Sequence, residues 1–522
     1  MRTNCNVLTN DTSIRRSCGV TIRSVVLIIL LSLSGLADAL AGETIVYSRC
    51  ERTTAEMDVT ANITLNGKRQ TVTRHMRGLD IYDVLPDITN FLGDFSAPCD
   101  LVYRDPDGVE TIIYDCSSNS TAEESCAALD PAVSFNAEII VFSVFRGSLR
   151  NYQEQLHSQI VHPDAEPEDL GYYDFPNKLL TTTGAHLHAY HIRSGQMRFI
   201  PFSPGIYDSG PTFINNQRVA FTSTRDDHTT SVVWGTTESR IGTRIWTMDI
   251  DSKNPDLASH HSLSQEQHPF MLKNGRLAYS SWQIFGGLPF RYSNNGAGTH
   301  TTIDNLFHIY AQDPDGAGNF PIYGQHSGDH NKSYFGADHK AAHFITQTSD
   351  DRIWFADYYR SNNKALGLLI GVMQEPEGLE GIGPQEASSD ADIFVPRDIV
   401  NFAAWTHSDD MPSFPMNKPM VVHPNYADPL PFAGKLGHPA ALPGNGLMMA
   451  WGKGACSTVA HYEIFSALGR AVPPLTSGSG GGVAMNMITS LEMDTPGCDV
   501  GLYRATQIPS QHPGDLEMIV DS

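Results

Sequence analysis

Histidine is the residue type in this chain with the widest chemical range, and its densest group lies between residues 325 and 343. The sequence has 21 histidines. The group contains His326, Asp329, His330 and His339 in a glycine-containing stretch. Imidazoles and carboxylates ligate Zn²⁺ and related ions, and glycines allow a loop to fold back on itself. The stretch is therefore a candidate divalent-metal site. The interpretation that we favour is an exposed polar loop whose side chains face water in different directions.

Two other arrangements place histidines on predicted strands. His186 and His188 alternate along a strand-like segment, so both side chains lie on one face. Two imidazoles on one face can bind Zn²⁺ or Cu²⁺, but no third ligand is specified, and a packed strand face is the alternative. His268 and His438 each precede a proline in a repeated phrase. Such equivalent positions are expected to do equivalent structural work, unless they form a ring of ligands at a central channel.

Sequence motifs of the common enzyme classes are absent. The chain has no G-x-S-x-G, no H-E-x-x-H and no P-loop. It has no C-x-x-C and hence no C-x-x-C-H attachment site for a c-type haem. The two DPDG segments, 105–108 and 313–316, are predicted to be hairpin turns rather than calcium loops. No cofactor is therefore certain, and a divalent metal at the 326–339 group is the one that the sequence favours.

The elements that must position these residues are pairs of short strands that recur along the chain. The repeated phrase has a short apolar segment, a turn of Asn, Asp or Gly, and an alternating strand that ends in Ser or Trp. Its copies begin at Asp130, Asp208, Glu266, Ala341 and Gly437. A second strand–turn–strand unit begins at Cys99, Ala185, Thr243 and Asn305. Alternation of the two units predicts four-stranded antiparallel modules, which are the signature of a β-propeller.

The expected architecture is all-β: a propeller of four-stranded antiparallel blades, six or alternatively seven, with long loop insertions. Alternation along the strands predicts that Val141 and Val219 pack between blades. The one segment that favours a short helix is 152–162. The sequence ends just after a strand-like segment. Either the N-terminal strand 43–49 closes the last blade, or the chain is a truncated copy of a longer protein.

The first 41 residues have the features of a signal peptide. Arg15, Arg16 and Arg23 precede a short apolar run, and small residues around Ala39 offer a cleavage site. The run is shorter than the roughly 20 residues of a membrane-spanning helix, so cleavage is favoured over anchoring. We therefore expect residues 1–41 to be removed and residues 43–522 to form a periplasmic or extracellular propeller. Membrane attachment is expected only if the segment stays uncleaved.

Cysteine usage agrees with export. Six of the cysteines follow the signal segment: Cys50, Cys99, Cys116, Cys126, Cys456 and Cys498. An even number of cysteines in an exported chain indicates disulfides. The favoured pairings are Cys116 with Cys126 and Cys456 with Cys498, because each would close a local excursion of the chain. The sequence alone leaves the other pairings open.

The charge of the chain narrows the classes of partner. Its 58 acidic and 35 basic residues give a formal net charge of −23. A nucleic-acid binder needs a basic stripe that follows the phosphates, and an anionic membrane surface also attracts basic residues. We therefore expect no nucleic-acid partner. A protein or peptide ligand is the expected partner, because a repeat scaffold with long insertions offers large binding surfaces.

The repeated phrases resemble those of TolB-like propellers, and more closely those of the propeller of hydrazine synthase alpha subunits. The matching runs are D-P-x-V-S-x-N-A-E-I-I-V-F-S from Asp130, the segment up to Pro211, Q-H-P-F-x-L-x-N-G-R-L-A-Y-S-S-W from Gln267, and G-H-P-x-x-L-P-x-N-G from Gly437. The resemblance covers most of the chain from about Cys99 onward and implies a propeller fold. Hydrazine synthase alpha subunits carry c-type haems. Because the attachment motif is missing here, the resemblance does not imply haem chemistry.

Three functions are consistent with these observations. The leading one is an exported binding or scaffold protein that interacts through its inserted loops and the channel mouth. The second is a metal-dependent enzyme, or a subunit of a redox complex, that uses the histidines and aspartate of the 326–343 loop. The third is a remnant of a haem-bearing family that is retained as a scaffold subunit. The absence of a catalytic motif favours the first function.

Overall fold

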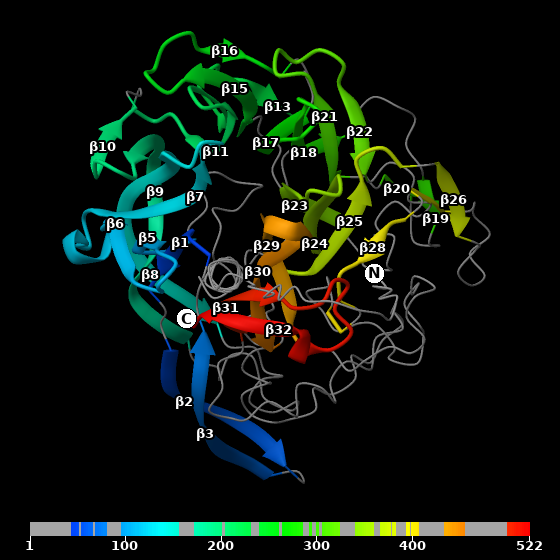
Figure 1. Ribbon diagram of the computed structural model, residues 1–522. Helices are drawn as coiled ribbons and strands as arrows, with labels where there is room; N and C mark the ends of the chain where they lie inside the picture. Colours follow the sequence, from blue (N-terminus) through cyan, green and yellow to red (C-terminus); the bar gives the residue numbers. More distant parts are fainter. Residues whose placement is uncertain are drawn as a thin grey trace, which may run out of the picture. The chain divides into compact units, whose positions relative to one another are not determined.

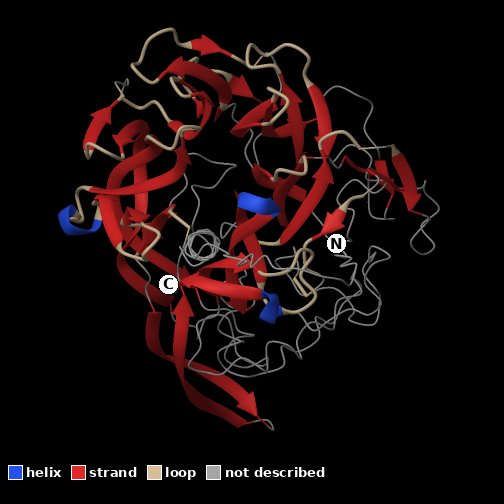
Figure 2. Cartoon of the chain, in the orientation of Figure 1, coloured by secondary structure: helices blue, strands red, loops and turns tan. Residues whose placement is uncertain are grey.

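The computed structural model describes residues 43–51, 54–65, 68–80, 95–155, 172–200, 204–230, 240–259, 264–284, 292–294, 299–301, 305–323, 340–359, 366–376, 378–382, 393–396, 398–403, 405–406, 433–454 and 498–521. Strands dominate these residues (Figure 2), and the helices among them are single 3₁₀ turns, η1 (Ser117–Asn119), η3 (Pro443–Asn445) and η4 (Pro513–Asp515). In this part of the chain no helix has the length and apolar character needed to cross a membrane.

Five sets of four antiparallel strands, called here modules, follow one another along the described chain (Figure 1). Modules 2 and 5 are separate four-stranded sheets, whereas module 1 belongs to one eight-stranded sheet and modules 3 and 4 belong to another. Module 1 contains β7 (Ser125–Val133), β8 (Ile139–Gln155), β9 (Tyr172–His191) and β10 (Gln196–Phe199), and module 2 contains β11 (Asp208–Asn215), β12 (Arg218–Ser223), β15 (Arg244–Asp249) and β16 (Asp256–Leu257). Module 3 contains β17 (Ser264–Met271), β18 (Leu277–Ile284), β21 (Asn305–Gln312) and β22 (Phe320–Tyr323), and module 4 contains β23 (Lys340–Gln347), β24 (Arg352–Tyr359), β25 (Leu368–Met373) and β28 (Val400–Asn401). Module 5 contains β29 (Lys435–Leu442), β30 (Gly446–Gly454), β31 (Cys498–Ala505) and β32 (Leu516–Val520). The chain is therefore an all-β protein with a β-propeller fold.

The remaining described strands precede the modules or lie in their connections. The N-terminal strands are β1 (Ile45–Cys50), β4 (Phe95–Ser96), β5 (Cys99–Arg104) and β6 (Glu110–Tyr114). Four hairpin pairs stand apart: β2 (Thr54–Leu65) with β3 (Lys68–Asp80), β13 (Thr229–Thr230) with β14 (Arg240–Ile241), β19 (Tyr292–Asn294) with β20 (Thr299–Thr301), and β26 (Leu379–Ile382) with β27 (Ile393–Pro396). The strand β1 pairs with β5, which differs from the expectation that it closes the last blade.

The five repeated phrases form the first two strands of the five modules. Each phrase is an antiparallel hairpin, from β7–β8 to β29–β30. Val141 and Val219 are both fully buried in one apolar cluster between modules 1 and 2, as alternation predicted. The predicted helix over 152–162 is wrong at its start, because β8 continues to Gln155 and pairs there with β9. The rest of that segment lies outside the described residues.

The first strand of every module has the same irregularity. Its register shifts by one residue, and a residue at the shift has a positive φ, between 48° and 59°. These five residues, called here the bulge residues, are Asp130, Gly210, His268, Phe344 and His438. A bulge holds one extra residue, and a left-handed conformation accommodates it, although it is strained for side chains other than glycine. The equivalence of His268 and His438 in the repeat is therefore a structural one.

Hydroxyl groups of the preceding module hold two of these bulges. The backbone N–H of Gly210 donates to Ser143 Oγ at 3.1 Å, and the backbone N–H of His268 donates to Thr222 Oγ1 at 3.0 Å. Ser143 and Thr222 occupy the same place on the second strands of modules 1 and 2. A hydroxyl at this place satisfies a buried N–H that the bulge removes from the ladder. The hydroxyl residues near the end of the repeated phrase thus have a structural role.

The two ends of the modules differ in their connections. The first and second strands are joined by the short segments 134–138, 216–217, 272–276, 348–351 and 443–445. The second and third strands are joined by 156–171, 224–243, 285–304, 360–367 and 455–497, and two of the connections between modules are 324–339 and 402–434. The end of each module at which its first and second strands are joined is called here the tight-turn end. The opposite end, at which its second and third strands are joined, is called the loop-rich end. Apart from the segment 374–399 of module 4, the long insertions leave from the loop-rich end, because strand direction alternates within each module.

Candidate functional site

Two buried acids mark the loop-rich end of neighbouring modules. Asp208 begins β11, and Glu266 lies near the start of β17. Each stands two residues before a bulge residue, and each is paired in register with a serine, Asp208 with Ser223 and Glu266 with Ser281. Their side chains are 2% and 1% exposed. Burial of a carboxyl group is costly unless the group is paired, so the surroundings of these two acids are informative.

Asp208 has a complete set of partners. Ser223 Oγ donates to Asp208 Oδ1 at 2.6 Å, and Arg225 Nη2 lies 2.7 Å from Oδ2. The Arg225 guanidinium lies over the rings of Phe221 and Trp246, at 4.8 and 5.3 Å from their centroids. Burial raises the pKa of Asp208, and the charge and hydrogen bonds of Arg225 oppose that rise. The pair is a satisfied ionic contact at the start of module 2.

Glu266 has no comparable partner. Its Oε1 atom lies 3.4 Å from Ser264 Oγ, and within the described part of the chain its Oε2 atom has no hydrogen-bond partner. The nearby Arg244 binds Asp226 instead, with 3.3 Å between Nη1 and Oδ2. Burial raises the pKa of Glu266 to about 8, and the Arg244 charge only partly opposes it. Glu266 therefore holds a proton at neutral pH.

Other polar atoms next to Glu266 share this lack of partners. Asp226 Oδ1, His228 Nε2 and Thr243 Oγ1 are buried and make no hydrogen bond among the described residues. Thr243 adjoins Glu266, whose backbone N–H donates to the Thr243 carbonyl at 3.0 Å, and Arg244 lies within electrostatic reach of Glu266. Asp226 and His228 are connected to Glu266 through Arg244, which binds Asp226 and lies within electrostatic reach of His228. Burial lowers the pKa of His228, so its imidazole is neutral. Asp226, His228, Thr243, Arg244 and Glu266 are called here the Glu266 cluster.

A second group of titratable side chains follows the bulges of modules 3 to 5. His268 Nδ1 lies 3.3 Å from His343 Nδ1, and His343 Nε2 lies 3.3 Å from Ser280 Oγ. Ser280 Oγ donates its proton to the Ala342 carbonyl at 2.6 Å. His343 Nε2–H therefore donates to Ser280, His343 Nδ1 accepts from His268 Nδ1–H, and His268 Nε2 is left as an acceptor. The hydrogen bonds thus fix the tautomers of both imidazoles.

Burial keeps these histidines neutral. It lowers the pKa of His268 and of His438 to about 4, and that of His343 well below its usual value. The ring of Phe344 separates His268 from His438, with centroid distances of 5.0 and 4.0 Å. His343 lies in strand β23 rather than in a loop. The three imidazoles form a packed row along the inner strands.

The described residues contain no metal centre. No group of three or more His, Cys, Asp or Glu side chains among them could hold a metal ion. The row of His268, His343 and His438 is not such a group. The residues of the predicted metal site, His326, Asp329, His330 and His339, lie outside the described residues, and that site stays a prediction.

His186 and His188 form a packed strand face. Both lie on β9 and are 4% exposed. The His188 ring stacks on Phe142 at 5.5 Å and meets the edges of Tyr114 and Phe199 at 5.2 Å each. Burial lowers the pKa of both histidines to about 4. Their surroundings are aromatic, which matches the packing interpretation rather than the metal one.

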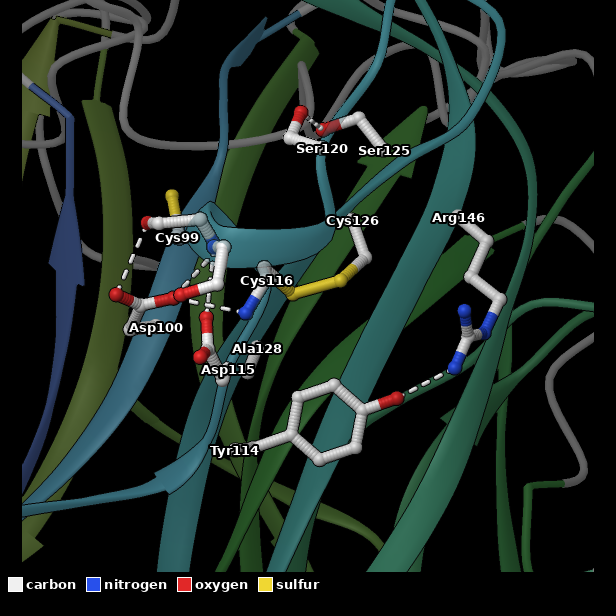
Figure 3. The surroundings of a disulfide bond; sticks show 12 residues. Cys99, Asp100, Tyr114, Asp115, Cys116, Ser120, Ser125, Cys126, Ala128 and Arg146 are labelled. Carbon is white, nitrogen blue, oxygen red and sulfur yellow. Dashed lines mark hydrogen bonds between the residues drawn. A yellow bond between two sulfur atoms is a disulfide. The ribbon is translucent and has the colours of Figure 1, made fainter.

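Two disulfides lie next to each other before and within module 1. Cys116 is joined to Cys126, one of the favoured pairings, and Cys50 is joined to Cys99. Asp100, next to Cys99, accepts hydrogen bonds from the backbone N–H groups of Cys116 and Ser117 at 2.8 and 2.9 Å (Figure 3). The proposed pairing of Cys456 with Cys498 depends on residues outside the described set. The Cys50–Cys99 disulfide therefore links β1 to β5, and the Cys116–Cys126 disulfide links the β6–β7 connection to β7 of module 1.

The sequence reasoning missed Asp208 and Glu266 as candidate site residues. Both stand in repeated phrases, and the signal was an acidic residue two positions before the bulge residue. An apolar repeat position that carries a carboxyl group in two copies is unusual, because module 1 has Ala128 there and module 4 has Ala342. Only the structure reveals that one acid is paired and the other is not.

Comparisons with known proteins add no family assignment. Neither family models nor curated proteins match the chain. Similar solved structures include an oligogalacturonate lyase in complex with manganese (12% identity, TM-score 0.31, covering 78% of this chain and 94% of that one). They also include dipeptidyl peptidase 4 of Porphyromonas gingivalis (10%, 0.30, 78% and 57%) and a putative TolB of Agrobacterium tumefaciens (12%, 0.20, 52% and 89%). The chain thus spans little more than half of the peptidase.

Proposed function

We propose that this chain is an exported β-propeller that binds a protein or peptide ligand through its loop-rich end. The observation that carries the proposal is the asymmetry of the modules. First and second strands are joined by short turns in all five modules, whereas second and third strands are joined by segments as long as 224–243 and 455–497. Binding residues of repeat scaffolds concentrate on such insertions, because rigid strands position them and the loops vary freely.

The positions of charged side chains also favour the loop-rich end as the binding surface. The buried acids Asp208 and Glu266 lie at the loop-rich end, whereas the Arg504–Glu517 pair at the tight-turn end is exposed. The two disulfides support a periplasmic or extracellular location, as does the signal-peptide pattern of the sequence. Within this proposal the chain is a TolB-like propeller related to that of hydrazine synthase alpha subunits but without haem attachment.

Site-directed photo-crosslinking tests the proposal. A photoreactive amino acid replaces Asp227, which is exposed in the 224–243 connection, and in a matched variant it replaces Asp315, which is exposed in a turn of the tight-turn end. Both variants are expressed in the exporting cell and irradiated. We expect a discrete protein adduct from position 227 and none from position 315. Equal adducts from both positions, or none from position 227, contradict the proposal.

Metal analysis of the same purified protein separates binding from metal-dependent catalysis. Replacement of His330 by Ala changes the predicted metal site of residues 326–339. A binding propeller retains its adducts at position 227 after chelation and in the His330→Ala variant. Stoichiometric metal that is lost in this variant, together with loss of thermal stability, favours the metal-dependent enzyme instead.

A further inference from the structure

The position equivalent to Glu266 in module 2 shows which group a buried acid there requires. Asp208 and Glu266 are equivalent, and each is paired in register with a serine. In module 2, Arg225 follows two residues after that serine and supplies the guanidinium that Asp208 binds. In module 3 the corresponding residue is Gln283, which carries no charge. Module 3 has therefore kept the buried acid and the serine but lacks the guanidinium.

The unpartnered atoms of the Glu266 cluster call for a hydrogen-bond donor. Asp226 Oδ1 can only accept, and Glu266 Oε2 can only accept once its carboxyl group is ionised. Thr243 Oγ1 and the neutral ring nitrogen His228 Nε2 can accept as well. A guanidinium has five N–H donors in one plane and no acceptor, so one such group can serve several of these atoms together. A bound anion would have the wrong sign for both carboxyl groups.

The cluster lies at the loop-rich end of modules 2 and 3. Asp226, His228 and Arg244 are half-buried and belong to the 224–243 connection or its edge, whereas Glu266 is 1% exposed. Asp226 is therefore the more exposed of the two carboxyl groups. The net charge of −23 attracts cations to the molecule from a distance.

We propose that the Glu266 cluster binds a guanidinium group, presented as an arginine side chain by the protein or peptide ligand of the loop-rich end. This inference rests on the function proposed above and names the chemistry of its ligand. The arginine fork faces the carboxyl groups of Glu266 and Asp226, in the way that Arg225 faces Asp208 within the chain. A serine, Ser223 or Ser281, stands opposite the acid in both modules.

Binding of the arginine is coupled to a proton. Free Glu266 is protonated at neutral pH, because burial raises its pKa and the charge of Arg244, which is paired with Asp226, only partly opposes that rise. The other titratable neighbours, His228 and Tyr279, are neutral there. A guanidinium within hydrogen-bonding distance favours the ionised carboxylate. The Glu266 O–H bond then breaks, and its proton passes to the solvent while the carboxylate keeps the electron pair.

Isothermal titration calorimetry at neutral pH tests the inference with defined probes. The probes are the capped peptide acetyl-Gly-Arg-Gly-amide, the same peptide with citrulline in place of arginine, and agmatine as a free guanidine. Titrations in two buffers with different ionisation enthalpies give the number of protons released. We expect the arginine peptide to bind at least about 10-fold more tightly than the citrulline peptide, which is isosteric but uncharged, and to release about one proton. We expect agmatine to bind more weakly than the peptide.

Two variants assign the effect to the cluster. Glu266→Gln keeps the shape of the side chain but cannot ionise, so it should weaken the arginine peptide by at least about 10-fold and abolish proton release. Glu517→Gln, at the tight-turn end, should leave both unchanged. Circular dichroism and urea unfolding verify that Glu266→Gln is folded. Should it fail to fold, Asp226→Asn, a half-buried position, replaces it with the same expectation for affinity.

The outcomes separate this inference from the proposed function. If the folded Glu266→Gln protein keeps the wild-type affinity and proton release, the Glu266 cluster is not the binding site. Agmatine binding as tight as that of the peptide overturns the protein source and assigns the cluster to small guanidines. If no probe binds but the crosslinks from position 227 are intact, the guanidinium inference is wrong and the proposed binding function is unaffected. Loss of those crosslinks overturns the proposed function itself.

Discussion

Modules 2 and 3 place an acid at the same position of the repeat, yet the two acids have different partners. Asp208 is bound by Ser223 and Arg225, whereas Glu266 lacks a guanidinium and holds its proton. Backbone geometry does not explain this difference, because both acids precede a bulge residue and oppose a serine. The repeat determines where a side chain lies, and a single partner outside the repeated pattern determines its ionisation. Structural equivalence in a propeller therefore does not imply chemical equivalence.

The largest expected effect is a loss of stability between about pH 4.5 and pH 8 caused by Glu266. Its pKa is about 8 in the folded chain, against 4.5 for an unperturbed glutamate, so the folded state binds the proton more tightly than the unfolded state. This stabilisation is complete below pH 4.5 and is lost as the pH rises through about 8, a decrease of about 5 kcal/mol in the free energy of unfolding. Urea unfolding across this range should show the decrease in the wild type and not in Glu266→Gln. If the pH profiles of the wild type and of Glu266→Gln are parallel, Glu266 is not the cause of the decrease.

Removing the partner of Asp208 should have the next largest effect. Arg225→Met deletes the guanidinium but keeps an apolar stem over Phe221 and Trp246. The loss in the free energy of unfolding should be about 3–5 kcal/mol, because a buried carboxylate is left unpaired. The double variant Asp208→Asn/Arg225→Met is the control, and urea unfolding at neutral pH is the measurement. A double variant no more stable than Arg225→Met alone would argue against the unpaired charge as the reason.

Giving Glu266 an internal partner should make module 3 resemble module 2. Gln283→Arg introduces a guanidinium at the position that corresponds to Arg225. It should lower the pKa of Glu266 toward its usual range and reduce the decrease in stability between about pH 4.5 and pH 8 by about 2 kcal/mol. The same variant should bind the arginine peptide more weakly, since its own arginine occupies the cluster. An unchanged pH profile together with unchanged affinity would mean that residue 283 does not reach Glu266.

The smallest effect belongs to an ion pair of the same type at the tight-turn end. Arg504 Nη2 lies 2.7 Å from Glu517 Oε2, and both side chains are exposed. Arg504→Met should therefore cost less than about 1 kcal/mol in urea unfolding, because water screens the pair and solvates Glu517 when it is alone. A cost as large as that of Arg225→Met would show that burial is not what distinguishes the two ends.

The sequence was sufficient for the parts of the fold that depend on local alternation and turns. The five repeated phrases are all hairpins, and Val141 and Val219 are buried where alternation placed them. The helix predicted over 152–162 was wrong at its start, because β8 pairs with β9 as far as Gln155. Strand pairing of this kind joins segments that are separated along the chain, so a local helical pattern does not reveal it. The metal site of residues 326–339 lies outside the described residues and stays a prediction.

The sequence by itself determined the repeat, its hairpins and the equivalence of His268 with His438, because these depend on side-chain period and turn residues within about twenty positions. Only the tertiary structure decided which buried polar groups have partners. His268 contacts His343 across 75 positions, and Glu266 adjoins Thr243 and lies within electrostatic reach of Arg244 of the preceding module. Burial makes an unpaired charge expensive, so the ionisation of these groups depends on neighbours that the packing of one module on the next brings into contact.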